Sequence, residues 1–235
     1  SASVPAQAQS FSQGGANSTS PNNLLPFVGT PSVLDFTGDN VYIGNSAPGS
    51  FSAVAGAVFK ADQLSIGNGG TGNGTVTASG AGTRFELLGS VGQRLEIGSW
   101  GVGTLTVSAG ALVDATLNPA GCLGGNCNTM LGNGAGSTGT LTITGTGSEV
   151  RTIRNFLVGQ SSVFTQPPNG FVFGTPGGTT NAFVNVLAGG TLRTEGAIVG
   201  NNNATPNGNG SEKANGTVLV DGVGSQWVVK HNSID

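Results

Sequence analysis

The sequence predicts an all-β fold, namely a single-stranded parallel β-helix, or solenoid, of about six coils. Three observations lead to this class. Glycine supplies 43 of the 235 residues, yet 36% of the residues are hydrophobic and evenly spaced, which indicates tight turns around a core rather than a disordered linker. An apolar residue followed by glycine recurs six times as the mark of a repeated unit. Each mark precedes a run that alternates apolar and polar residues, as strands do.

Residues 1–40 lack the repeated unit, and we expect them to form a lead-in or cap for a repeat domain that spans 41–235. The segment 28–40 has the composition of a strand and turn. The tripeptide Ala6-Gln7-Ala8 has the small-x-small form of a signal-peptidase site, which favours an exported protein. The alternative is an Ala/Ser/Gln tail without a processing role.

Each unit contains three short apolar runs separated by glycine turns. The marks are Ile43-Gly44, Ile66-Gly67, Ile97-Gly98, Leu131-Gly132, Val158-Gly159 and Val199-Gly200. The alternating runs are 51–54, 74–78, 103–107, 139–143, 183–186 and 216–220. A third set of runs covers 58–61, 84–88, 112–115, 149–153, 191–194 and 226–229. Stacking such units buries a column of side chains that one unit cannot bury alone.

The turns of successive units alternate between two forms, so the true period is a pair of coils. Odd units turn through Ala-Gly, as at 109–110, and even units through Gly-x-Gly, as at 145–147. In the even units, Phe85, Val150 and Trp227 follow the turn at matching positions, which predicts a core position for Trp227. The inward residues predicted for the third unit are Leu95, Ile97, Leu105, Val107 and Val113.

The pattern IGxxGxGTLTVSAGA…LGNGAGSTGTLTITGTGS resembles the repeat named for autotransporter (type V secretion) passengers and PEP-CTERM proteins. The resemblance covers roughly residues 41–230 and depends on spacing and alternating turns. It implies a right-handed β-helix at the surface of a Gram-negative bacterium, with a function in adhesion, cell–cell aggregation or biofilm formation. It also implies an outer-membrane barrel or sorting signal outside this chain, and we therefore expect the chain to be part of a longer protein.

The two cysteines, Cys122 and Cys127, lie in the loop CLGGNC, where two glycines let the chain close on itself. In an exported protein this spacing predicts a small disulfide loop. Zinc binding would need more ligands than these two cysteines and the distant His231 supply. The sequence therefore predicts no metal site.

An insertion at 161–181 contains three aromatic residues, Phe164, Phe171 and Phe173. We consider this segment the candidate binding loop of the chain. The alternative is a small satellite core packed against the coils, because exposed clusters of Phe are uncommon.

Threonines occupy outward positions of three successive alternating runs, and we expect them to form a ladder. The residues are Thr75, Thr77, Thr104, Thr106, Thr140 and Thr142. Such a ladder resembles the ice-binding face of some solenoid antifreeze proteins. The alternative is that Thr is simply a favourable residue for the outer face of a strand.

No arrangement of residues predicts an enzyme or a cofactor. The 11 acidic residues are spread along the chain, no GxSxG motif occurs, and His231 is the only histidine. Stacked acids such as those of a polysaccharide-active enzyme remain an alternative, while Asp114 and Arg193, two coils apart, are expected on a solvated face. A net charge of −3 with scattered Lys and Arg argues against nucleic acid. The expected partners are a glycan or protein on a host or bacterial surface, or further copies in a self-assembling filament or matrix.

Overall fold

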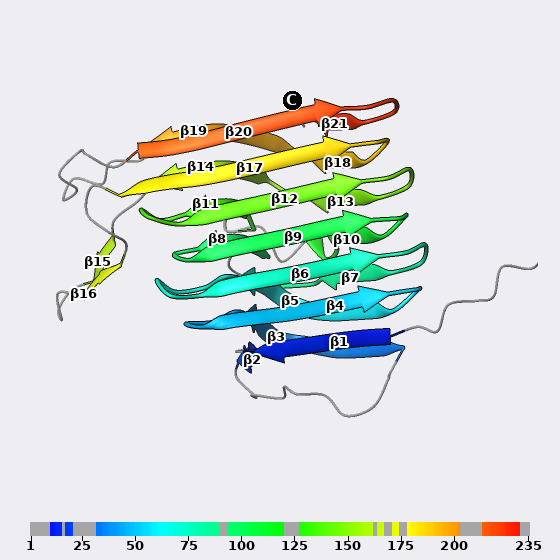
Figure 1. Ribbon diagram of the computed structural model, residues 1–235, viewed down its shortest axis with the longest axis horizontal. Coiled ribbons are helices and arrows are strands. Elements are labelled where there is room, and N and C mark those ends of the chain that lie inside the picture. Colours follow the sequence, from blue (N-terminus) through cyan, green and yellow to red (C-terminus); the bar gives the residue numbers. More distant parts are fainter. Residues whose placement is uncertain are drawn as a thin grey trace, which may run out of the picture.

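The computed structural model describes residues 10–15, 17–20, 32–89, 94–119, 127–161, 164–166, 171–173, 178–202 and 213–230. Within these ranges the fold is all-β, with parallel strands in stacked sheets, as a β-solenoid requires. Figure 1 shows the strands stacked in sequence order, from the blue N-terminal end to the red C-terminal end. The described residues include no helix of the length and apolar character needed to cross a membrane.

The first sheet holds the alternating run of every unit. Its strands, in spatial order, are β1 (Ser10–Gly15), β4 (Pro48–Val54), β6 (Asn73–Ser79), β9 (Val102–Ser108), β12 (Thr138–Thr144), β17 (Thr179–Leu187) and β20 (Lys213–Asp221). All neighbours from β4 to β20 pair in parallel, whereas β1 runs antiparallel to β4. The opposite direction of β1 is visible in Figure 1.

The second sheet holds the other two runs of every unit. One row contains β7 (Arg84–Leu87), β10 (Leu112–Ala115), β13 (Glu149–Thr152), β18 (Thr191–Thr194) and β21 (Gln226–Val229). The other row contains β8 (Leu95–Ser99), β11 (Thr129–Asn133), β14 (Asn155–Ser161) and β19 (Gly196–Asn202). The rows join at β5 (Val58–Ile66), which pairs with both β7 and β8 and, on its other side, with β3 (Val33–Ile43).

The N-terminal segment covers the first edge of both sheets. In the first sheet, β1 pairs with β4, and in the second, β2 (Asn17–Ser20) runs antiparallel to β3. The boundary expected at residue 41 falls inside β3, which pairs in parallel with β5 from Val33 onward. Regular stacking therefore begins upstream of the first apolar-Gly mark.

The core consists of columns in which one residue from each unit lies above the equivalent residue of the next. The apolar members of the marks form one column, because Ile43, Ile66, Ile97, Leu131, Val158 and Val199 are consecutive register partners. A second column runs through Leu34, Phe59, Phe85, Val113, Val150, Leu192 and Trp227. The five inward residues predicted for the third unit are all fully buried, and Trp227 packs against the core, so both predictions are confirmed.

Glycine is required where the second and first sheets meet. Gly98 has φ of 72°, and a Cβ there would lie 2.2 Å from the Thr138 carbonyl oxygen. A Cβ on Gly103 would lie 2.2 Å from the Gly98 nitrogen. Two backbone segments thus touch without side chains between them. The same constraint explains why the apolar-Gly marks recur together with a glycine at the start of the alternating run.

A Ser or Thr hydroxyl group in each even turn distinguishes the even turns from the odd turns. Ser148, in an even turn, donates to the Thr144 carbonyl oxygen at 2.7 Å and accepts from the Gly110 amide of the preceding odd turn at 3.0 Å. Thr83 and Ser225 make the equivalent pair of hydrogen bonds in the other even turns. Each even turn therefore completes the hydrogen bonding of the odd turn before it.

The columns end in exposed apolar residues at the C-terminal side of the stack. Val186 is fully buried, but its register partner Val220 is 43% exposed because no described strand lies beyond it. Val199 and Val229 end their own columns with similar exposure.

Replacing Ser148 with Ala should lower the free energy of unfolding by about 1–3 kcal/mol, because the half-buried Gly110 amide loses its acceptor. Urea unfolding followed by circular dichroism measures the effect. Thr146→Ala, an exposed position of the same turn, serves as the control and should change stability by less than about 0.5 kcal/mol. Equal stability of Ser148→Ala and the parent chain would show that the inter-coil hydrogen bond does not stabilise the stack.

Candidate functional site

The structure brings all six threonines of the predicted ladder together on the first sheet. Thr75, Thr104 and Thr140 are consecutive register partners on β6, β9 and β12. A second column, two residues along each strand, contains Thr77, Thr106 and Thr142. The residues between them in sequence are buried, so the threonine side chains lie on the outer side of the sheet.

Serines on β4 extend the ladder toward the N-terminal end of the sheet, and further Ser and Thr residues extend it along β6, β9 and β12. We call the outer side of β4, β6, β9 and β12 the hydroxyl face. Its hydroxyl-bearing residues are Ser50, Ser52, Thr75, Thr77, Ser79, Thr104, Thr106, Ser108, Thr138, Thr140, Thr142 and Thr144. Neighbouring hydroxyls are close enough to bond, since Ser108 Oγ lies 3.0 Å from Ser79 Oγ. No Lys, Arg, Asp or Glu stands at an outward position of these four strands.

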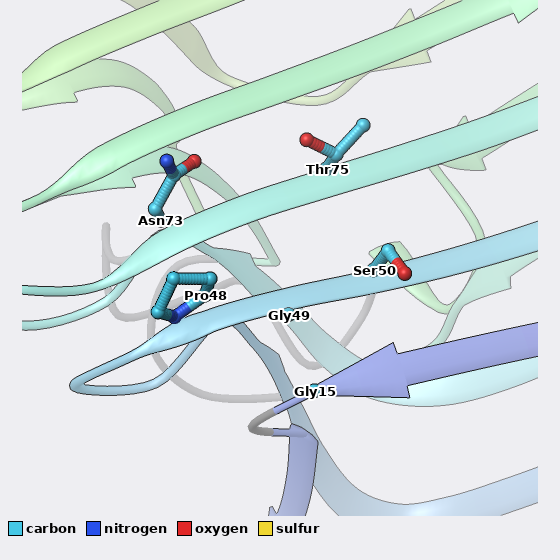
Figure 2. A pocket seen from close by; sticks show the side chains of 6 residues that line it. All are labelled: Gly15, Pro48, Gly49, Ser50, Asn73 and Thr75. Carbon is cyan, nitrogen blue, oxygen red and sulfur yellow. The ribbon is translucent and has the colours of Figure 1, made fainter.

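A shallow hollow of about 390 Å³ lies at the N-terminal corner of the hydroxyl face. Figure 2 shows Ser50 on β4 and Thr75 on β6 beside it, with Asn73 and Pro48 at the strand starts. All of its lining groups are uncharged. The hollow therefore offers hydrogen-bonding groups and open space.

The ladder does not continue unchanged beyond β12. On β17 its two positions are occupied by Phe183, which is 40% exposed, and Asn185, and on β20 by Thr217 and Leu219. Asn185 Nδ2 lies 3.5 Å from Thr142 Oγ1. The hydroxyl face thus gives way to a more apolar surface toward the C-terminal end.

The candidate binding loop forms an antiparallel hairpin of β15 (Phe164–Gln166) and β16 (Phe171–Phe173). Phe164 pairs with Phe173 in its register. The side chains of these residues lie outside the part of the chain that the structure describes. The choice between a binding loop and a satellite core therefore stays a prediction.

Cys127 is buried and disulfide-bonded, and it packs against Ile153 in a small cluster beside the main core. Cys122, the other cysteine of the chain, lies outside the described residues. Within the described residues there is no group of three or more His, Cys, Asp and Glu side chains that could hold a metal ion.

Charged residues that are scattered in the sequence align on the second sheet. We call this set the charge column; it contains the register partners Asp35, Lys60, Glu86, Asp114, Arg151 and Arg193. Arg151 stands between Asp114 and Arg193, and its Nη1 lies 3.7 Å from Asp114 Oδ2. Asp114 itself is buried, although the sequence placed it on a solvated face. Insertions of unequal length separate these residues along the sequence.

Glu149 holds the two arginines of the charge column in place. Its Oε2 accepts from Arg151 Nη2 at 2.7 Å, and its Oε1 accepts from Arg193 Nε. Partial burial acts to raise the pKa of Glu149, but the hydrogen bonds and charges of the two arginines outweigh it, so the pKa is lowered from its ordinary value. Glu149 is therefore ionised and fixes both guanidinium groups.

Sequence reasoning missed a buried arginine that fastens a loop. Arg94 is fully buried, and its Nε donates to the Gly89 carbonyl at 2.7 Å. Its Nη1 and Nη2 donate to the carbonyls of Ala115 and Asn118, each at 2.8 Å, and Nη1 also donates to Leu117. One side chain therefore satisfies the carbonyl groups of the chain that leaves β10. A polar residue beside an apolar run was the only signal in the sequence.

Glu96 is a buried carboxyl group that the sequence did not single out. Ser65 Oγ donates to Glu96 Oε2 at 3.1 Å from the neighbouring strand. Burial raises the pKa of Glu96 above its ordinary value of 4.5, while hydrogen bonds from Ser65 and Ser99 act in the opposite direction. Raised carboxyl pKa values occur at catalytic sites, and the groups that hydrogen-bond to Glu96 among the described residues are the hydroxyls of Ser65 and Ser99.

No protein-family model, curated protein or solved structure matches the chain.

Replacing Glu96 with Gln should raise the free energy of unfolding at pH 8 by more than about 0.5 kcal/mol, the usual range of a surface substitution. A raised carboxyl pKa in the folded state means that the parent chain loses stability as the pH rises from about 4.5 through the folded pKa. A neutral amide does not titrate, so the difference should vanish below pH 4. Urea titrations between pH 3.5 and pH 8 measure it.

The control for this pH series is Glu86→Gln, at a half-buried carboxylate 3.7 Å from Lys60 Nζ. This variant should be no more stable than the parent chain at pH 8, because it loses the ion pair with Lys60. A stability difference for Glu96→Gln that stays constant from pH 3.5 to pH 8 would show that Glu96 does not titrate differently in the folded chain.

Proposed function

We propose that this chain is part of an exported bacterial surface protein in which a stiff β-solenoid displays an adhesive face. The resemblance to autotransporter passenger repeats supports a right-handed β-helix of about six coils at the surface of a Gram-negative bacterium. The observation that carries the proposal is the hydroxyl face, where two threonine columns lie in register on four strands without outward charges. Parallel stacking makes such a scaffold rigid, because each strand is bonded to both neighbours.

The chemistry of the hydroxyl face suits attachment to another neutral, hydroxyl-rich or amide-rich surface. Regularly spaced Ser and Thr donate and accept hydrogen bonds without the desolvation cost of buried charges. Many weak contacts on two repeating surfaces act together, as in any multivalent attachment. Attachment through this face requires no cofactor and no turnover.

Placing two glutamates on the hydroxyl face should abolish attachment. The variant Thr77→Glu/Thr142→Glu puts one charge on β6 and one on β12, with Thr106 between them. Bacteria that display this variant should aggregate or coat a glycan surface at least fivefold less than bacteria that display the parent chain. The reason is that each carboxylate must be desolvated on contact.

The control is Gln226→Glu, an exposed position of the second sheet, which should attach as the parent does. Thermal unfolding of both purified variants confirms that they fold. Unchanged attachment by the double variant would rule out the hydroxyl face as the adhesive surface. Thermal hysteresis of the parent chain in supercooled water would instead show that the threonine columns bind ice.

Self-association through the end of the stack is a second candidate function. The exposed ends of the inner columns favour it, because Val220 is 43% exposed and β20 has one unpaired edge among the described strands. The opposite end is covered by β1 and β2. Association through this edge would join the like ends of two copies in a dimer, whereas a longer filament would need a second contact.

Val220→Lys should abolish this dimer, since a charged side chain then ends the column. Sedimentation velocity over a hundredfold range of protein concentration measures the dimer directly. Val102→Lys is the matched control, because Val102 has the same 43% exposure but lies on the hydroxyl face. If dimers persist in Val220→Lys and disappear in Val102→Lys, the contact lies on the hydroxyl face and not at the end of the stack.

A further inference from the structure

A pocket of about 270 Å³ lies on the second sheet, away from the hydroxyl face, where β13, β18 and β21 end. Arg151, Arg193 and Lys230 line it, which gathers three of the eight Lys and Arg residues of an acidic chain. They come from three successive units. The meeting of these three cations was not predicted from the sequence, because insertions separate the residues along the chain.

The two arginines of the pocket are held in position before any ligand binds. Glu149 accepts hydrogen bonds from both arginines, and the bond from Arg193 uses its Nε–H group. The N–H groups of the two Nη atoms of Arg193 can therefore donate to a ligand. The Arg193 side chain is 52% exposed. Lys230 is anchored through its backbone amide, which donates to the Thr194 carbonyl at 2.7 Å.

A buried hydroxyl in the pocket wall lacks a partner. Thr152 is 2% exposed, and its Oγ1 makes no hydrogen bond to any described group. A buried polar atom without a partner is uncommon in folded proteins. The neighbouring hydroxyl of Thr194 is occupied, because it accepts from Trp227 Nε1 at 3.2 Å.

A carboxylate in the lining points to a sugar rather than to a simple anion. Glu195 Oε2 accepts from the Arg154 amide at 2.9 Å, and its second oxygen can accept from a ligand hydroxyl. A site for an inorganic anion would be weakened by this negative group. A sugar acid carries both an anionic group for the cations and hydroxyls for Glu195.

We propose that this pocket binds one carboxylate-bearing sugar unit of an acidic polysaccharide. The guanidinium of Arg193 forms paired hydrogen bonds to the sugar carboxylate, and Lys230 adds a second positive charge. Glu195 accepts a sugar hydroxyl, and the methyl groups of Val228 contact the ring. The volume is below the roughly 300–1,000 Å³ of pockets for drug-sized ligands, which suits a single sugar unit.

Isothermal titration of the full chain with a trigalacturonate tests the proposal, and the fully methyl-esterified trisaccharide is the neutral probe. We expect trigalacturonate to bind and the ester to bind at least tenfold more weakly. The Arg193→Gln and Lys230→Met variants should each weaken trigalacturonate binding at least tenfold. Raising the salt concentration should weaken binding to the parent chain, because the contact is ionic.

Arg84→Gln is the matched control, because Arg84 lies on the same sheet, and its Nε is 3.4 Å from Glu86 Oε1, outside the pocket. It should bind trigalacturonate within twofold of the parent chain. Circular dichroism confirms that each variant folds, and Lys230→Met removes an exposed charge without touching Glu149. Absence of binding, equal binding of the ester, or an equal loss in Arg84→Gln would overturn the proposal.

This inference does not rest on the proposed adhesive face. The Thr77→Glu/Thr142→Glu variant should keep its affinity for trigalacturonate, because its substitutions lie on the first sheet. If that variant loses attachment and keeps trigalacturonate binding, the two sites act separately. If it loses trigalacturonate binding while remaining folded, the saccharide binds on the hydroxyl face and the pocket is not its site.

Discussion

The contact between two glycine-containing backbone segments, where the second sheet turns into the first, is the constraint on which the stack depends. A Cβ on Gly98 would lie 2.2 Å from the Thr138 carbonyl oxygen of the next unit, and a Cβ on Gly103 would lie 2.2 Å from the Gly98 nitrogen. This close approach fixes the position of each turn relative to the next coil. Because a strand that slips by one residue exchanges its inner and outer side chains, the fixed turn also fixes which residues face the core.

In-register stacking converts a short sequence pattern into long surface columns. One outward Thr per strand is an ordinary residue, but its repetition at the strand spacing of about 4.8 Å produces a periodic array of hydroxyls. The same stacking aligns the charge column on the second sheet. The two sheets therefore present surfaces of different chemistry, one neutral and one ionic, and both follow from a single repeat.

The sequence predicted those features that depend on the repeat alone. The marks, the strand runs, the inward residues such as Leu105 and the threonine ladder are spaced by the unit itself. The sequence also placed Asp114 and Arg193 two coils apart at matching positions. The rest of the charge column and the pocket lined by Arg151, Arg193 and Lys230 depend on which residues of different units become neighbours, and insertions of unequal length conceal that. The role of Arg94 depends on the path of the chain after β10. Repeat periodicity carries no information about such a path.

The most direct test of this account measures the register of the hydroxyl face in solution. In a threonine-methyl-labelled sample, nuclear Overhauser effects should connect Thr77 with Thr106 and Thr106 with Thr142, which are partners on adjacent strands. No effect should connect Thr77 with Thr142, two strands apart. Effects that connect Thr106 with Thr140 in place of Thr142 would place β9 and β12 in a different register. They would contradict both the glycine constraint and the columns derived from it.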